Sequence, residues 1–270
     1  MEGLWQSMRG EEVQTQRANG PQMVNSLLEI PRVMLEATRL GVSWPTLISS
    51  APKGEPHPVM VLPGFSAGDE STLPLRNFIT RLRYKALPWL QGVNTGNPAK
   101  LESVMRRFFR MHQVYGTKIS LVGQSLGGVF AREIAREFPD AVRCVITLGS
   151  PYAAQNGEAT NPAIKRLFEE MSGLTVEEMR AMVPSAESQT PLPLPTTSVY
   201  SKEDGVVGWQ ACVEPENELS ESVRVLGSHT GMAMNPDVLH LIADRLAQNP
   251  ASWSKFDRRR GCRQFAYPHR

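Results

Sequence analysis

The sequence lacks an apolar run of about eighteen residues, the length that a membrane-spanning helix requires. The segment 1–12 contains acidic side chains and no apolar core of the kind that secretory signals carry. These two absences predict a cytoplasmic protein without a transmembrane segment, and they leave peripheral contact with a membrane open.

Cysteine is also scarce, with three residues in the chain, Cys144, Cys212 and Cys262. An odd and low count argues against a disulfide framework, although a Cys212–Cys262 bond stays open. The spacing of cysteines and histidines does not match a zinc site, so we expect neither a metal nor another cofactor. Cys144 lies in an apolar run and is expected to behave as a small buried hydrophobe.

The chain carries no large excess of charge of either sign. Lys and Arg total 29 and Asp and Glu total 27, which gives a net charge of +2. This balance does not favour a nucleic-acid partner. The segment 251–270 is basic, and we interpret it as a solvent-exposed tail, with binding of an anionic partner as the alternative.

Short apolar runs alternate with amphipathic stretches from residue 58 onward, which predicts an α/β fold with a mostly parallel central sheet and helices on both faces. We expect a polar N-terminal segment and helix over 1–45, the α/β domain over 46–250, and the tail over 251–270. The predicted strands are 58–62, 84–87, 118–122, 142–148, 197–200 and 222–226. The predicted helices are 73–82, 99–113, 125–138 and 235–246, the last capped by Asn235.

Two further segments interrupt this pattern. Residues 24–40 have roughly helical apolar spacing broken at Pro31, and this helix could pack on the domain or contact a partner or a membrane surface. Residues 152–195 form a long insertion with helical pieces at 163–171 and 176–182. Long insertions in compact domains are often functional, so we expect a lid here.

The strongest motif is Gly123-Gln124-Ser125-Leu126-Gly127, a G-x-S-x-G sequence that follows a predicted strand and opens a predicted helix. In this context the turn lifts the Ser125 hydroxyl above the edge of the sheet. We therefore expect Ser125 to be a nucleophile. A glycine-rich phosphate loop is the alternative, but no Gly-Lys-Ser/Thr sequence follows.

A nucleophilic serine needs a base and an orienting acid, which follow the serine in this class of fold. His229 lies between the predicted strand 222–226 and the last helix, so it is the expected base, while His57 and His112 precede Ser125. Asp204, on the turn after the strand that ends at Tyr200, is the expected acid. Glu203 is its rival, and a purely turn-supporting Asp204 is the remaining alternative.

Hydrolysis also requires hydrogen-bond donors for the negative oxygen of the intermediate. We expect these to be the backbone N–H groups of Leu126, directly after the nucleophile, and of Phe65, in the loop after strand 58–62.

Together, several short sequences carry a resemblance to a known family. They are Val61-Leu62-Pro63-Gly64-Phe65, the motif around Ser125, Leu148-Gly149-Ser150-Pro151, Asp204-Gly205-Val206-Val207 and Gly227-Ser228-His229. Over about residues 45–250 the chain resembles bacterial lipase/esterase-like α/β-hydrolases. The resemblance implies hydrolysis of carboxylic esters, a Ser125/Asp204/His229 triad and a lid at 152–195. It departs at Pro63, where many lipases have a histidine.

The expected function is therefore a serine hydrolase that cleaves an acyl or lipid-like ester, a small-molecule substrate, through an acyl-enzyme on Ser125. An acyltransferase with the same triad is one alternative, because the outcome depends on which nucleophile reaches the acyl-enzyme. A non-catalytic binding protein of the same fold is the other.

Overall fold

The computed structural model describes residues 19–153, 159–176, 178, 190–259 and 266–268. Its centre is a six-stranded sheet with the order β2-β1-β3-β4-β5-β6, in which every neighbouring pair is parallel. The strands are β1 (Pro58–Leu62), β2 (Lys85–Leu87), β3 (Ile119–Gln124), β4 (Val142–Leu148), β5 (Thr196–Ser201) and β6 (Ser220–Val225). The predicted parallel sheet is thus confirmed, with strand ends that move by at most two residues.

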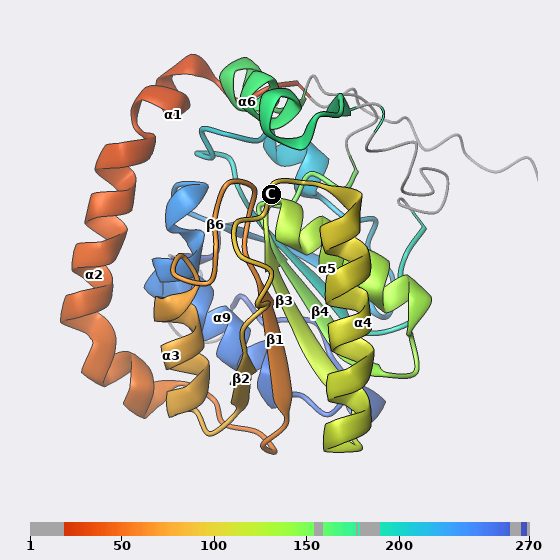
Figure 1. The fold of residues 1–270 in the computed structure, drawn as a ribbon. Coiled ribbons are helices and arrows are strands. Elements are labelled where there is room, and N and C mark those ends of the chain that lie inside the picture. The colour runs from red at the N-terminus through yellow and green to blue at the C-terminus, as the bar shows by residue number, and fades with distance from the viewer. Residues whose placement is uncertain (1–18, 154–158, 177, 179–189, 260–265, 269–270) are drawn as a thin grey trace, which may run out of the picture.

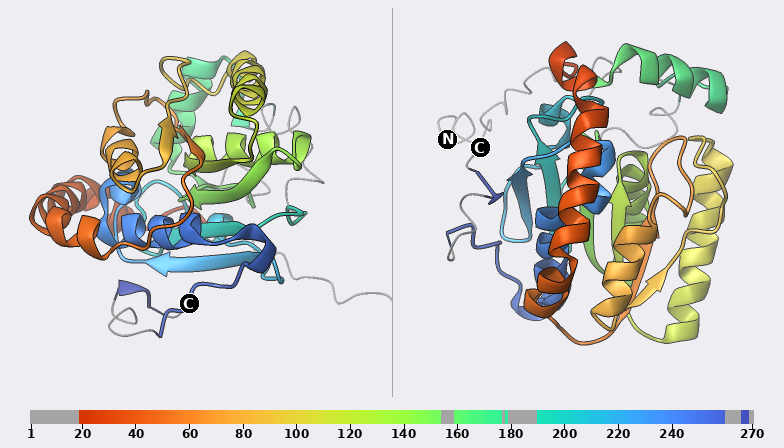
Figure 2. Two further views of the ribbon diagram at one scale, coloured as in Figure 1. Left: turned by 90° about the horizontal axis from the view of Figure 1, so that it is seen from below. Right: turned by 90° about the vertical axis from the view of Figure 1, so that its left-hand side faces the viewer.

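Helices cover both faces of this sheet (Figure 1, Figure 2). They are α1 (Met23–Leu27), α2 (Glu29–Ser50), α3 (Leu73–Arg81), α4 (Pro98–Tyr115), α5 (Leu126–Glu137), α6 (Pro162–Ser172) and α9 (Pro236–Ala247). Short 3₁₀ helices follow β5 and β6 at η2 (Trp209–Cys212) and η3 (Thr230–Met234), and a third, η4, spans Pro250–Ser252.

The alternation of side chains along the strands builds two large apolar cores, and a third, smaller cluster lies around Tyr200 of β5. In β1, Val59 and Val61 belong to the core that includes residues of α2, α3 and α9, whereas Met60 and Leu62 belong to the core beneath α4 and α5. All five residues of β1 are buried, as expected for a parallel strand that is covered on both faces. The sheet is therefore a rigid support for the loops at its ends.

The chain changes direction across the sheet between β1 and β3. After β1 it places β2 on one side, then crosses to place β3, β4, β5 and β6 in order on the other. In open parallel sheets, sites form at the carboxyl ends of the strands near such a switch point. The segments that follow β1, β3, β5 and β6 at this edge are the ones that contain the predicted site residues.

The N-terminal helix has an unusual distribution of polarity. In α1 and the first half of α2 the buried positions are the polar Asn25, Glu29 and Glu36, while large apolar side chains are exposed; the second half of α2 buries Leu40 and Leu47. The break expected at Pro31 lies earlier, at Leu28, and Pro31 falls in the first turn of α2, where proline is tolerated. Helix α2 packs against η3 and α9. Of the two readings for this segment, the structure therefore shows packing on the domain.

Other predictions concern single features. Asn235 caps α9 by accepting from the backbone N–H of Asp237 at 3.0 Å, as expected. Cys144 and Cys212 are buried free thiols, and Cys262 lies outside the described residues. In the part of the chain that the structure describes, no helix has both the length and the apolar character needed to cross a bilayer.

Candidate active site

Ser125 lies on a sharp turn between β3 and α5. Its backbone has φ 51° and ψ −123°, a conformation that residues with a side chain rarely adopt. The flanking glycines make the turn possible, because a Cβ at Gly123 would lie 2.3 Å from the Gly127 oxygen and one at Gly127 would lie 2.4 Å from the Leu62 oxygen. The predicted strand–turn–helix context of the motif is therefore present.

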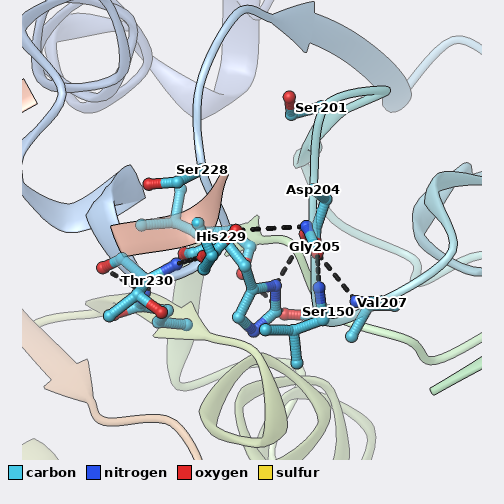
Figure 3. A network of polar contacts seen from close by, with 12 residues as sticks. Ser150, Ser201, Asp204, Gly205, Val207, Ser228, His229 and Thr230 are labelled. Carbon is cyan, nitrogen blue, oxygen red and sulfur yellow. Dashed lines mark hydrogen bonds and ion pairs between the residues drawn. The ribbon is translucent and has the colours of Figure 1, made fainter. Parts of the chain in front are cut away.

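Asp204 and His229 meet through the loops that follow β5 and β6. His229 Nδ1 lies 2.6 Å from Asp204 Oδ2, and the carboxylate must accept because an ionised carboxylate has no hydrogen to give (Figure 3). The other oxygen, Oδ1, accepts from the backbone N–H groups of Val206 and Val207 at 2.8 and 2.7 Å. Asp204 thus supports its own turn and also contacts the imidazole at Nδ1.

The rival acid, Glu203, is engaged elsewhere. Its carboxylate accepts from Ser201 Oγ at 2.9 Å and pairs with Arg224 Nη2 at 3.0 Å. The structure therefore pairs His229 with Asp204 and gives Glu203 a different set of partners.

Two contacts bring the histidine loop to the end of β3 and β4. Gln124, directly before Ser125, donates from Nε2 to the backbone oxygens of His229 and Thr230 at 3.0 and 3.2 Å. The backbone of Gly149 passes beside the imidazole, since a Cβ built there would lie 3.0 Å from His229 Nδ1. Among the described residues, no hydrogen bond joins Ser125 Oγ to His229. Such bonds often tighten only when substrate binds, so the complete triad stays a prediction.

The environment of His229 favours its protonated form. Burial alone would lower its pKa, but the charge and hydrogen bond of Asp204, with a smaller contribution from the charge of Glu29, outweigh burial and raise the pKa above the ordinary value of 6.5. An imidazole that gains a proton during a reaction would be stabilised by the same charges.

The two expected oxyanion donors lie on either side of Ser125. A Cβ at Gly64 would be 3.3 Å from Ser125 Cβ, so the loop that contains Phe65 passes directly over the serine. Buried Asn94 holds this loop by donating to the Pro63 oxygen at 3.0 Å. Within the described part of the chain, the backbone N–H groups of Phe65 and Leu126 have no hydrogen-bond acceptor, which leaves both available to a ligand. Their catalytic role remains a prediction.

Helix α6, in the insertion predicted to be a lid, lies across the site end of the sheet (Figure 1). Its Phe168 packs edge-on against Phe65 with 5.3 Å between ring centroids. Phe168 also shares an apolar cluster with Leu126, Leu192 and Leu194. The second expected helix, 176–182, lies almost entirely outside the described residues, and lid motion stays a prediction.

A second serine–histidine contact lies at the opposite end of the sheet, where His57 Nε2 and Ser120 Oγ are 2.8 Å apart. Such a pair could in principle be catalytic. However, Ser120 is fully buried, and His57 Nδ1 contacts the backbone oxygen of Glu55 in place of a carboxylate. Burial lowers the pKa of His57 to about 4. We therefore interpret this pair as part of the folded core.

Sequence reasoning missed three residues that contact the loops of the site: Glu29, Glu36 and Gln124. The two glutamates lie seven residues apart on one helix, a spacing that places them on the same face. The residues between them are mostly apolar, and two acidic side chains on one face of such a helix were the sequence signal for a polar contact. Gln124 could have been noted because it directly precedes the proposed nucleophile. Among the described residues, no group of three or more metal-binding side chains is present.

We compared the sequence and the fold with those of known proteins. No family model matches the sequence, and no curated protein matches it. Solved structures do match. They include Aspergillus fumigatus lipase B (TM-score 0.55, 16% identity, 75% of this chain and 55% of that one) and Bacillus licheniformis lipase BlEst2 in mature form (0.54, 13%, 74% and 95%). A Paleococcus ferrophilus monoacylglycerol lipase matches with a TM-score of 0.54 at 12% identity, over 71% of this chain and 96% of that one.

Proposed function

We propose that this chain, which has the α/β-hydrolase fold, is a serine hydrolase that cleaves carboxylic esters through an acyl-enzyme on Ser125. The observation that supports this most directly is the 2.6 Å contact between His229 and Asp204, formed by two loops at the same sheet edge as the strained Ser125 turn. A core-stabilising role would not require a serine in a rare backbone conformation at this edge.

In the proposed reaction, His229 Nε2 accepts the Ser125 hydroxyl proton as Oγ attacks the ester carbonyl carbon. The carbonyl oxygen becomes negative, and the N–H groups of Phe65 and Leu126 donate to it. When the C–O bond to the alcohol breaks, His229 returns the proton to the departing oxygen. A water molecule, deprotonated by the same imidazole, then attacks the acyl-enzyme and releases the acid and free Ser125.

We infer an apolar acyl group as the preferred substrate. Phe65, Phe168 and Leu126 present apolar side chains around the turn that carries the serine. Burial of each additional methylene of a substrate against such a surface contributes about 0.8 kcal/mol. Two of the structures with this fold are named lipases and a third a monoacylglycerol lipase, which agrees with this inference.

The test is hydrolysis of a series of p-nitrophenyl esters of increasing acyl length by the wild type, Ser125→Ala and Ser120→Ala. We expect Ser125→Ala to lose turnover by about 10⁶-fold, as removal of such a nucleophile does in a comparable enzyme. Ser120→Ala, the matched control from the buried pair, should keep it. Near-normal turnover by Ser125→Ala, or loss in Ser120→Ala with its fold intact, would overturn the proposal.

A fluorophosphonate probe gives an independent result, because it reacts with an activated serine and not with an ordinary one. Labelling of the wild type that is absent in Ser125→Ala supports an enzyme. No labelling of the wild type would favour the non-catalytic alternative.

A further inference from the structure

One carboxylate of the N-terminal helix joins both loops of the candidate site. Glu29 Oε1 accepts from the backbone N–H of Thr230 at 2.7 Å, and Glu29 Oε2 accepts from that of Gly205 at 3.1 Å. Thr230 directly follows the proposed base, and Gly205 directly follows the proposed acid (Figure 3). The side chain of Glu29 therefore sets the separation of the two loops that carry His229 and Asp204.

A second carboxylate, Glu36, holds the histidine loop from one side. It accepts from the Ser228 backbone N–H at 2.9 Å, from the Ser228 hydroxyl and from Asn235 Nδ2 at 3.2 Å. The loop closes around it, because a Cβ at Gly231 would lie 1.6 Å from Glu36 Oε2 and one at Gly227 would lie 2.3 Å from Oε1. Only glycine at these two positions leaves room for the carboxylate.

Three more bonds tie the same helical segment to the loop of the acid. Asn25 Nδ2 donates to the Lys202 oxygen at 3.0 Å, Ser26 Oγ to the Gly205 oxygen at 2.6 Å, and Arg32 Nη1 to the Glu203 oxygen at 2.7 Å. These contacts explain why the polar side of the helix faces inward although its outer side is apolar.

Burial of these two carboxylates has a cost in solvation. Glu29 and Glu36 are 8% and 3% exposed, and the pKa of Glu36 is raised because it is buried, although bonds from Ser228 and Asn235 oppose the rise. A neutral amide would lose less solvation on burial, but its single oxygen could accept from only one of the two loops that Glu29 joins. A negative charge is useful where a positive charge forms, and His229 gains a positive charge when it accepts the serine proton.

We propose, on the basis of the serine hydrolase function above, that Glu29 is a positioning residue which fixes the Asp204–His229 pair and stabilises the imidazolium formed during the reaction. Glu36 restrains the loop that carries His229 through its hydrogen bonds with Ser228 and Asn235. The N-terminal helix is then part of the catalytic apparatus, although it precedes the first strand of the sheet.

Two substitutions test the two parts of this role, the positioning of the loops and the stabilisation of the imidazolium by charge. Glu29→Gln keeps the size of the side chain but removes the charge and one of the two acceptor oxygens, whereas Glu29→Asp keeps the charge and shortens the reach. We expect both variants to lose about tenfold in kcat on p-nitrophenyl butyrate with KM within about twofold, because a hydrogen bond to a charged group is weakened in each. Glu203→Gln, a nearby carboxylate with other partners, is the matched control and should keep the wild-type kcat.

The pH dependence identifies the electrostatic part. Loss of the Glu29 charge should lower the pKa of His229, so in Glu29→Gln the acid limb of kcat/KM should move to lower pH. Glu29→Asp should keep the wild-type limb. A purely structural role would change the thermal midpoint without moving this limb.

Titration of the His229 ring nitrogens by NMR, assigned by comparison with His229→Asn, measures the same quantity without turnover. A lower titration midpoint in Glu29→Gln than in the wild type is expected. An unchanged midpoint and an unchanged kcat in a folded Glu29→Gln protein would overturn the positioning role while the hydrolase proposal stands. If the wild type neither turns over ester nor reacts with a fluorophosphonate, the hydrolase proposal and the catalytic role of Glu29 both fail, and the NMR midpoint then reports only its electrostatic effect on His229.

Discussion

Asp204 Oδ2 lies 2.6 Å from His229 Nδ1, while the second oxygen of the same carboxylate is held by two backbone N–H groups. The aspartate is therefore fixed from its own loop before it contacts the histidine. A carboxylate held in this way fixes the tautomer and the orientation of the imidazole before substrate binds.

Asp204→Asn should lower kcat by about 10⁴-fold, because the amide no longer requires a hydrogen on Nδ1 and allows the wrong tautomer. The amide oxygen can still accept from Val206 and Val207, so the thermal midpoint should change little. Steady-state hydrolysis of p-nitrophenyl butyrate and thermal unfolding measure both effects. Loss of activity below about tenfold, or an equal loss in Glu203→Gln, would show that Asp204 is not the acid.

The kcat/KM of the wild type should fall as the pH drops below an apparent pKa above 6.5. His229 must be neutral to accept a proton, and its pKa is raised by Asp204 and Glu29 against the opposing effect of burial. Because its pKa is raised, His229 takes up a proton at higher pH than an ordinary histidine does, so the loss of activity begins at higher pH. A profile from about pH 5 to about pH 9 measures this limb. A midpoint clearly below 6.5 would contradict the assignment of His229 as the base.

His57 should make the fold sensitive to mild acid. Its pKa is lowered to about 4 by burial, against 6.5 when it is exposed. Its contribution to stability is therefore complete above pH 6.5 and is lost as the pH falls from there toward about 4, because only the unfolded chain takes up the proton. The full loss corresponds to about 3 kcal/mol.

Chemical denaturation of the wild type and His57→Gln at several pH values measures this effect. The variant should be less stable near neutral pH and should lose less free energy of unfolding on acidification. Parallel pH dependences for the two proteins would mean that His57 is not the responsible group.

Phe168→Ala should reduce kcat/KM for long-chain esters more than for acetate. The ring packs on Phe65 beside the serine, so its loss removes apolar surface that a long acyl chain would contact. Stability should fall by about 3 kcal/mol, which is typical of a buried phenylalanine replaced by alanine. Leu167→Ala is the control, because this neighbour on α6 is 39% exposed. If wild type and Phe168→Ala show the same dependence of kcat/KM on acyl-chain length, Phe168 does not contact the acyl chain of the substrate.

Periodicity was sufficient to predict most of the fold. Strands such as Pro58–Leu62 and Val142–Leu148 are continuous apolar runs bounded by turn residues, and their structural bounds match the predicted ones. The sharp turn at Ser125 was predictable because the motif fixes local backbone geometry, while the role of its hydroxyl stays a prediction. Asp204 and His229 were predictable as members of loops at one sheet edge, and the choice over Glu203 agrees with the observed hydrogen bond.

The contribution of the N-terminal helix could not be predicted from local pattern. Its glutamates meet partners 176 to 201 residues away, and the pattern around them gives only the shared face. Apolar spacing over 24–40 suggested that the apolar side would face the domain. In the structure, the backbone N–H groups of Gly205, Ser228 and Thr230 donate to Glu29 and Glu36, so the polar side is the buried one at these two positions.

The two buried glutamates in the first half of α2 also affect how the molecule must assemble. Contacts between segments this far apart in the chain form slowly, because the loop that they close is nearly the whole domain. During synthesis α2 emerges before β5 and β6, so Glu29 and Glu36 must wait for the loops that follow those strands. During refolding, the circular-dichroism signal of the sheet and its helices should therefore recover before ester cleavage does, since the contacts of Glu29 and Glu36 with the loops after β5 and β6 form late.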